Sequence, residues 1–135
     1  MDLTTMAAHV EHLFAAGAPK PIAPFSHATA WGPLLFVTGQ MPIIAETGEY
    51  VRGTFAEQTD AVMRNLETML KAAGSDWSRV LHARIYLTDF SKYAEVNAAY
   101  ERWFEKGKLP ARTCIGVTAL AGGADVEIDL LAVRG

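Results

Sequence analysis

The sequence is organised around Pro110-Ala-Arg-Thr-Cys-Ile-Gly-Val117, read together with Val126-Glu-Ile-Asp-Leu130 near its end. Both segments have the pattern of short strands, and Gly122-Gly123 between them indicates a turn. Each segment carries one charged side chain in apolar surroundings, Arg112 in the first and Glu127 in the second. Each of these charges needs a partner, a ligand or a wet cleft, because removing a lone charge from water is costly.

The two charges suit chemistry on a small anionic molecule. A free guanidinium offers a planar, two-pronged grip for a carboxylate, and a glutamate can hold or activate a water molecule. The alternative is that Arg112 and Glu127 form a structural ion pair near a strand end, with no role in function.

The composition indicates one compact domain. Half of the 135 residues are hydrophobic and a fifth are charged, so the chain can bury a core and still offer an apolar face to a copy of itself. The net charge of −3 and the absence of a basic stripe argue against a nucleic-acid surface. The single cysteine, Cys114, excludes an internal disulfide and a multi-cysteine metal site. His9 and His12 share a helical spacing, but two ligands are too few to predict a metal.

The start of the chain predicts a cytoplasmic protein without a membrane span. No apolar run approaches the roughly 20 residues that a transmembrane helix needs. A signal peptide is not expected, because the first positive side chain is Lys20 and polar residues interrupt the apolar stretch before it.

Residues 1–16 predict a short amphipathic helix. Met6, Val10, Leu13 and Phe14 fall at near-helical spacing, and Gly17 follows them. We therefore divide the chain into an N-terminal helical extension, residues 1–17, and a main domain, residues 18–135.

The remaining periodicities predict a mixed α+β domain. The expected order is two strands (25–31 and 34–38), a helix opened by the capping box of Thr54 and Glu57, a strand (80–88), a second helix ending at Gly107, and the two final strands. Two helices cover only one face of a sheet. The runs 34–37 and 128–131 give apolar side chains to both faces, so we infer that the second face is buried by self-association.

Three residues within this pattern stand out. Gly39 follows an apolar strand and lets a backbone or ligand approach closely; the alternative is a bulge or bend. Asn65 and Asn97 are polar positions beside the apolar stripes of the two helices. We expect Asn65 at the surface. Asn97 is either exposed or reaches a neighbouring loop through its amide.

The chain resembles the RidA/YjgF family of reactive-intermediate imine deaminases. Pro-Ala-Arg-Thr-Cys followed later by Val-Glu-Ile is the most specific part of the resemblance, which runs from about residue 20 to the C-terminus. The matching pieces are Pro24-Phe-Ser-His27, Val37-Thr-Gly-Gln-Met-Pro42, Thr47-Gly48, Glu57-Gln58, Asn65-Leu66, Ala73-Gly74, Ile85-Tyr-Leu-Thr-Asp89, Val96-Asn97, Tyr100, Phe104, Pro110-Ala-Arg-Thr-Cys114 and Val126-Glu-Ile128.

The resemblance implies a fold like that of chorismate mutase, a mixed sheet with two helices packed on one face. It implies a homotrimer with a cleft at each subunit interface. It also implies hydrolysis of 2-imino and enamine acids to the 2-oxo acid and ammonia, without a metal or an organic cofactor.

The same resemblance assigns roles to individual residues. Arg112 would clamp the substrate carboxylate, Glu127 would orient or activate the attacking water, and the backbone around Cys114 would meet the imine nitrogen. Thr38 and Gly39 would line the cleft.

Asn97 would support that cleft from the second helix. Many family members have tyrosine in place of Phe25 and serine in place of Thr38. We expect the apolar ring of Phe25 to favour a larger or more hydrophobic imine.

Two other functions compete with deamination. The cleft could hold a 2-oxo acid or an amino acid without turnover, as a binding or regulatory module. Ribonuclease activity has also been ascribed to the wider family, but the acidic balance and the lack of a basic aromatic groove disfavour it here.

Overall fold

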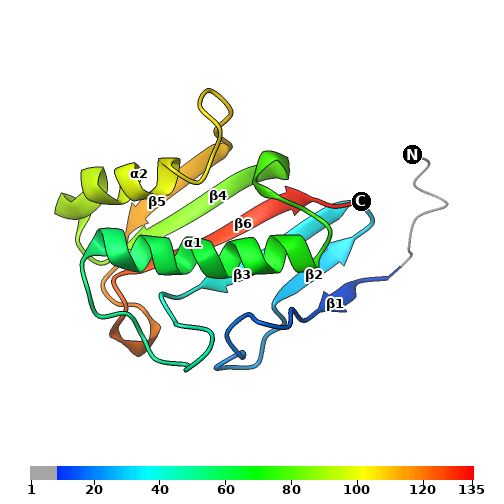
Figure 1. Ribbon diagram of the computed structural model, residues 1–135, viewed down its shortest axis with the longest axis horizontal. Helices are drawn as coiled ribbons and strands as arrows, with labels where there is room; N and C mark the ends of the chain where they lie inside the picture. The colour runs from blue at the N-terminus through cyan, green and yellow to red at the C-terminus, as the bar shows by residue number, and fades with distance from the viewer. Residues whose placement is uncertain (1–8) are drawn as a thin grey trace.

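A computed structural model describes residues 9–135 and shows a six-stranded sheet with two helices (Figure 1). The strand order is β1-β2-β3-β6-β4-β5, antiparallel except for the parallel pair β4 and β5. The predicted mixed α+β sheet with two helices is confirmed. The strands are β1 (Glu11–Leu13), β2 (Ala28–Trp31), β3 (Leu34–Gln40), β4 (Val80–Leu87), β5 (Ala111–Gly116) and β6 (Val126–Val133), and the helices are α1 (Phe55–Ala72) and α2 (Tyr93–Glu101).

The core lies between the helices and one face of the sheet. β6 runs through the middle of the sheet and alternates buried and half-buried residues along its whole length. Its buried residues are Val126, Ile128, Leu130 and Ala132. They share one core cluster with apolar side chains of α1, among them Val62, Leu66 and Leu70. Burial of this alternating set fixes the register of the strand, because a slip of one residue would turn the set towards solvent.

The face of the sheet away from the helices, called here the open face, is apolar in part. Four large side chains on it are 39–49% exposed: Trp31, Leu34, Phe36 and Ile115. The prediction that apolar residues point to both faces is therefore confirmed. Self-association through this face stays a prediction.

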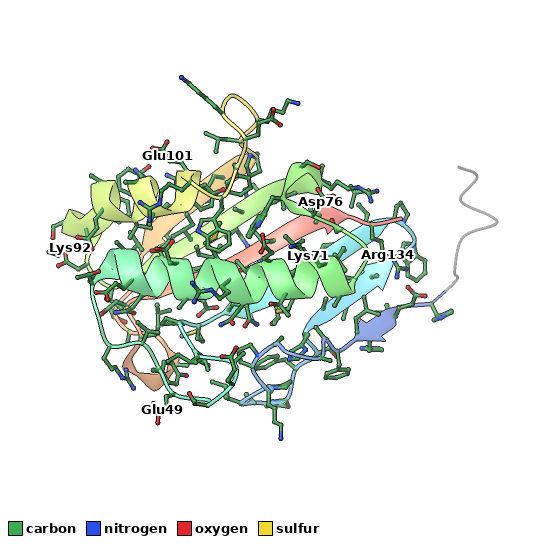
Figure 2. The ribbon with its side chains drawn as sticks, viewed as in Figure 1. Glu49, Lys71, Asp76, Lys92, Glu101 and Arg134 are labelled. Atoms are coloured by element: carbon green, nitrogen blue, oxygen red, sulfur yellow. The ribbon has the colours of Figure 1, made fainter. Side chains whose placement is uncertain are left out.

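The predicted N-terminal helix is wrong where the structure describes it. Residues 1–8, which include Met6, lie outside the described residues. From Glu11 to Leu13 the chain is strand β1, paired with β2. Sheet pairing overrides the helical spacing, and Arg134, labelled in Figure 2, adds an ion pair to the Glu11 carboxylate.

His27 also ties this segment to the sheet. Its buried ring accepts a hydrogen bond from the Ala15 N–H at Nδ1 and contacts the Pro19 carbonyl through Nε2, each at 2.8 Å. Since Nδ1 is the acceptor, Nε2 carries the proton and donates to Pro19. Residues 15–19 are therefore held against the domain.

Helix α2 is shorter than expected. It ends at Glu101 instead of continuing to Gly107. The indole N–H of Trp103 donates to Asp60 on α1, and the ring of Phe104 packs edge-on against Trp77. These aromatic residues therefore complete the core from a turn.

Helix α1 keeps the predicted capping box, in which Thr54 and Glu57 bond reciprocally. Asn65 on this helix is buried, so its expected surface position is wrong. Its amide donates to the carbonyls of Met41 and Ile43, at 3.3 and 2.7 Å. This contact fixes the loop that follows β3.

We predict that Asn65→Ala lowers the free energy of unfolding by about 1–3 kcal/mol, because the buried Ile43 carbonyl loses its donor. Urea unfolding at a fixed protein concentration measures the change. Arg64→Ala, at the exposed neighbouring position, is the matched control and should change stability by no more than about 0.5 kcal/mol. Equal effects of the two changes would contradict the structural role of Asn65.

Candidate functional site

Arg112 and Glu127 point to opposite faces of the sheet. Arg112 is registered with Ala83, which is fully buried towards the helices. Glu127 is registered with Tyr86, whose chain neighbour Ile85 is fully buried on the helix side. Residues directly opposite across paired strands share a face, and successive residues alternate. Within one chain the two charges therefore cannot form the structural ion pair considered as an alternative, and they do not share a pocket.

Glu127 gathers three of the predicted substrate-binding residues around it. A pocket of about 240 Å³ is lined by Glu127, Phe25, Thr38 and Gly39, with further residues from the loops. We call Glu127, Phe25, Thr38 and Gly39 the glutamate half-site. It draws on β3, β6 and the segment before β2, so residues far apart in the sequence form one pocket.

Gly39 makes room for the Glu127 carboxylate. A side-chain carbon added at residue 39 would overlap with the carboxylate oxygen. The pairing of β3 with β6 also shifts between Val37 and Gln40, which is a bulge. Both interpretations of Gly39 therefore hold: the strand is irregular there, and a functional group approaches the backbone closely.

Partial burial raises the pKa of Glu127, and the negative charge of Asp129 adds to the shift. Asp129 is itself held by Arg84 and Tyr86: the Arg84 Nε–H donates to one of its oxygens at 2.7 Å and the Tyr86 hydroxyl to the other at 2.9 Å. Glu127 accepts no hydrogen bond from the part of the chain that the structure describes. Its carboxyl group is thus open to a water or a ligand.

The arginine lies in an aromatic frame on the helix side. The Arg112 Nη2–H donates to the Tyr93 hydroxyl at 2.8 Å, and the guanidinium carbon lies 5.5 Å and 5.3 Å from the ring centres of Tyr93 and Tyr100. Stacking and one hydrogen bond hold the guanidinium in place. Among the described residues no carboxylate pairs with it, so its other N–H groups are free for a ligand.

Asn97 and Cys114, the two remaining predicted residues, belong to this same region. Asn97 lies on α2 between Tyr93 and Tyr100, at helical spacings of four and three. Cys114 follows Arg112 on the same face of β5, and partial burial raises the pKa of its thiol. We give the name arginine half-site to these five residues: Arg112, Tyr93, Asn97, Tyr100 and Cys114. The thiol has no neighbouring base in the described chain, consistent with a main-chain role.

Two buried oxygen atoms in this region have no hydrogen-bond partner among residues 9–135. They are Oδ1 of Asn97 and the hydroxyl of Tyr100, which is only 3% exposed. Burial raises the pKa of Tyr100 to about 12, so the phenol keeps its proton. Unpaired buried polar atoms beside a free guanidinium indicate a place for a water or ligand atom.

The sequence did not indicate several supporting residues. Gln58, 2% exposed, donates to the Asp125 carboxylate at 3.0 Å and accepts from the Asp125 N–H at 2.9 Å. These bonds fix the chain just before β6, two residues ahead of Glu127. Gln58 appeared in the sequence only as part of the matching piece Glu57-Gln58, without a role of its own. Tyr93, which binds the Arg112 guanidinium, was not singled out in the sequence, and 36% of it is exposed.

Within residues 9–135, no group of three or more metal-ligating side chains gathers, and neither helix has the length and apolarity to cross a membrane.

The chain is similar to known proteins over most of its length. The family model described as "Endoribonuclease L-PSP" matches residues 15–134. A RutC family protein of Pyrococcus horikoshii is 38% identical over 124 residues, which are 92% of this chain and 98% of that protein. The mouse 2-iminobutanoate/2-iminopropanoate deaminase is 36% identical over 118 residues, 87% of each chain. The crystal structure of E. coli TdcF with bound serine has a TM-score of 0.83 at 26% identity, covering 91% of this chain and 99% of that one.

We predict that Glu127→Gln raises the free energy of unfolding near neutral pH, because an amide avoids the cost of ionising a half-buried carboxyl group. The pKa of Glu127 is raised on folding, so the folded chain holds this proton more tightly than the unfolded chain. The cost therefore begins near the unfolded pKa of about 4.3, grows as the pH rises towards the folded pKa and is complete above it. It disappears at lower pH, where glutamate is protonated in both states.

Urea unfolding from pH 4 to pH 8 measures this difference. Glu101→Gln, at an exposed position, is the matched control and should have little effect at any pH. A gain from Glu127→Gln that stays constant across the pH range would contradict the prediction.

Proposed function

Because this chain belongs to the endoribonuclease L-PSP family (YjgF/RidA/RutC), we propose that it hydrolyses reactive 2-imino and enamine acids to 2-oxo acids and ammonia. One observation carries the proposal. In the described part of each chain, the guanidinium of Arg112 has an aromatic frame but no carboxylate partner, and the half-buried carboxylate of Glu127 accepts no hydrogen bond. The two groups lie on opposite faces of the sheet. A relative of this family is named as an imine deaminase.

We propose that the complete site forms between copies, with the arginine half-site of one chain facing the glutamate half-site of another. Arg112 lies on the edge strand β5, beside α2, where a neighbour can reach it. The glutamate pocket opens beside β3, near the apolar residues of the open face. Contact of that face with a second chain would bury those residues and bring the two halves together. A ring of three copies, the homotrimer that the resemblance implies, would hold three such sites.

In the proposed reaction Arg112 grips the substrate carboxylate and leaves the C=N carbon near Glu127. The imine carbon is already electrophilic, so the protein needs mainly to fix the anion and aim a water molecule. The Glu127 carboxylate takes a proton from water as the oxygen bonds to the imine carbon. It then returns the proton to nitrogen, which gives a carbinolamine. The same carboxylate next carries the hydroxyl proton to nitrogen as the C=O bond forms and the C–N bond breaks, so ammonia leaves and the 2-oxo acid remains. A raised pKa makes Glu127 a stronger base for this step.

The other predicted residues would shape the cleft. Thr38 and Gly39 line the wall on the glutamate side, and the backbone at Cys114 meets the imine nitrogen from the arginine side. The orphaned Asn97 and Tyr100 oxygens would hold a water or a ligand atom beside Arg112. No metal or organic cofactor takes part in this proposal.

The reaction can be tested directly. An amino-acid oxidase generates the imine in the assay mixture. Semicarbazide traps the imine that has not been hydrolysed, so a loss of trapped product measures hydrolysis by this protein. Faster consumption with the protein than without it supports the proposal. Unchanged rates for imines of every size would overturn it.

The alternative is a binding module without turnover. The observation that favours it is the crystal structure of E. coli TdcF, a relative, with bound serine. Binding of a 2-oxo acid or amino acid at the same site, with no faster hydrolysis of any imine, would select this alternative.

We predict that Arg112→Ala and Glu127→Gln each abolish activity, whereas a mixture of the two variants, unfolded and refolded together, recovers it. A site between copies would then pair the intact Arg112 of one variant with the intact Glu127 of the other. Random assembly gives this pairing in about a quarter of the interfaces, so about a quarter of the wild-type rate is expected. Refolding each variant alone is the control. No recovery in the mixture would place the site within one chain and contradict the interface proposal.

We also predict that Phe25→Tyr increases turnover of the smallest imine, derived from alanine, relative to a bulky one. A hydroxyl in the pocket adds a hydrogen-bonding group beside the cleft, while the apolar ring of Phe25 favours larger or more hydrophobic imines. The ratio of kcat/KM values for the two imines measures the change. An unchanged or lower ratio would count against a role of Phe25 in substrate choice.

A further inference from the structure

The pocket beside Glu127 does not end at the glutamate half-site. A second hollow of about 320 Å³ lies next to the first and shares four lining residues with it, Pro19, Lys20, Ile22 and Ile43. The two hollows together form a groove that starts at the Glu127 carboxylate, passes Ile22 and Ile43, and reaches the loop 45–48. This groove is larger than a site for a three- or four-carbon acid needs.

The middle of the groove is mostly apolar and its ends are polar. Met41 and Ile43 are buried in its wall, whereas Ile22 is 56% exposed and Phe25 37% exposed. Glu127 lies at one end and Glu46 and Thr47 lie at the other, whereas Lys20 lines both hollows together with Ile22 and Ile43. An exposed isoleucine and phenylalanine facing one hollow offer apolar surface to a ligand.

Both walls of the groove are held in place by buried polar contacts. On one side, His27 binds the backbone at Ala15 and Pro19, which fixes the chain leading to Ile22. On the other side, the Asn65 amide binds the Ile43 carbonyl. The groove is therefore formed before a ligand arrives, and little ordering would oppose binding.

The direction of the groove matches the third substituent of the substrate. In the proposed reaction the carboxylate lies at Arg112 and the C=N carbon lies at Glu127. The side chain is the group left over, and it must leave the site along a path that starts at Glu127. The groove provides that path on the chain that also supplies Glu127.

We propose that this groove binds the side chain of the substrate, and that the preferred substrates are 2-imino acids with apolar side chains larger than ethyl. The proposal rests on the proposed deaminase function and specifies its substrate class. Methyl and ethyl side chains, those of the substrates in the name of the mouse relative, would leave the groove beyond Ile22 unfilled. A longer apolar chain would cover the exposed Ile22 and Phe25 surface.

Binding of the product-like 2-oxo acids tests the groove without requiring catalysis. We would titrate the full-length assembled protein with straight-chain 2-oxo acids from pyruvate to 2-oxooctanoate in a calorimeter. The expected result is a Kd that falls about fourfold with each added methylene until the groove is filled. Equal affinity for pyruvate and 2-oxooctanoate would overturn the proposal.

Two variants test whether the groove causes the dependence of affinity on chain length. Ile22→Ser removes exposed apolar surface from the wall and should flatten the dependence on chain length while leaving pyruvate binding nearly unchanged. Val10→Ser is the matched control, because Val10 is 48% exposed and lines neither hollow. A dependence that survives Ile22→Ser in full, or that Val10→Ser weakens equally, would contradict the assignment.

The same acids separate this inference from the deaminase proposal. If long 2-oxo acids bind more tightly but no imine is hydrolysed faster, the groove stands and the deaminase function fails. If imines are hydrolysed at rates and affinities independent of chain length, the function stands and the groove assignment fails. If no 2-oxo acid of any length binds and no imine is hydrolysed faster, both are overturned.

Discussion

The alternation of side chains along β5 and β6 is the constraint on which the candidate site depends. Strand pairing through β4 sends Arg112 towards the helices and Glu127 towards the open face. No rotamer change can bring the two together, since the sheet lies between them. A chemistry that uses both charges therefore requires a second chain, and the need for assembly follows from strand register.

The register itself is fixed by features on both sides of β6. Buried residues along the strand pack under α1, and the Gln58 side chain binds Asp125 immediately before the strand. The bulge at Gly39 in the neighbouring strand then makes space for the Glu127 carboxylate. Core packing and the position of one functional group are thus set by the same few contacts, so mutations in α1 can act on the site at a distance.

The sequence predicted the elements whose patterns are local. The capping box at Thr54, the periodicity of residues 80–88 and the short-strand pattern of residues 126–130 were sufficient to place the main helix and the central strands. The members of the glutamate half-site were named in advance through a family resemblance, and so were Asn97 and Cys114 of the arginine half-site. Tyr93 and Tyr100, which frame Arg112, were not named as site residues.

Tertiary contacts decided what the sequence could not predict. Residues 11–13 have helical spacing but complete the edge of a sheet, and Asn65 looks like a surface residue but binds a distant loop. The separation of Arg112 from Glu127 depends on which strand lies between them, and strand order is not encoded in any local sequence pattern.

The two charges left without partners also limit how the copies can meet. If Arg112 and Glu127 of neighbouring chains touched directly, they would neutralise each other and exclude the substrate. In the proposed assembly, association would therefore rest on other surface, and the exposed apolar side chains of the open face, such as Phe36 and Ile115, would provide it. Apolar contacts would then hold the copies together while the charges stay apart by the width of a ligand.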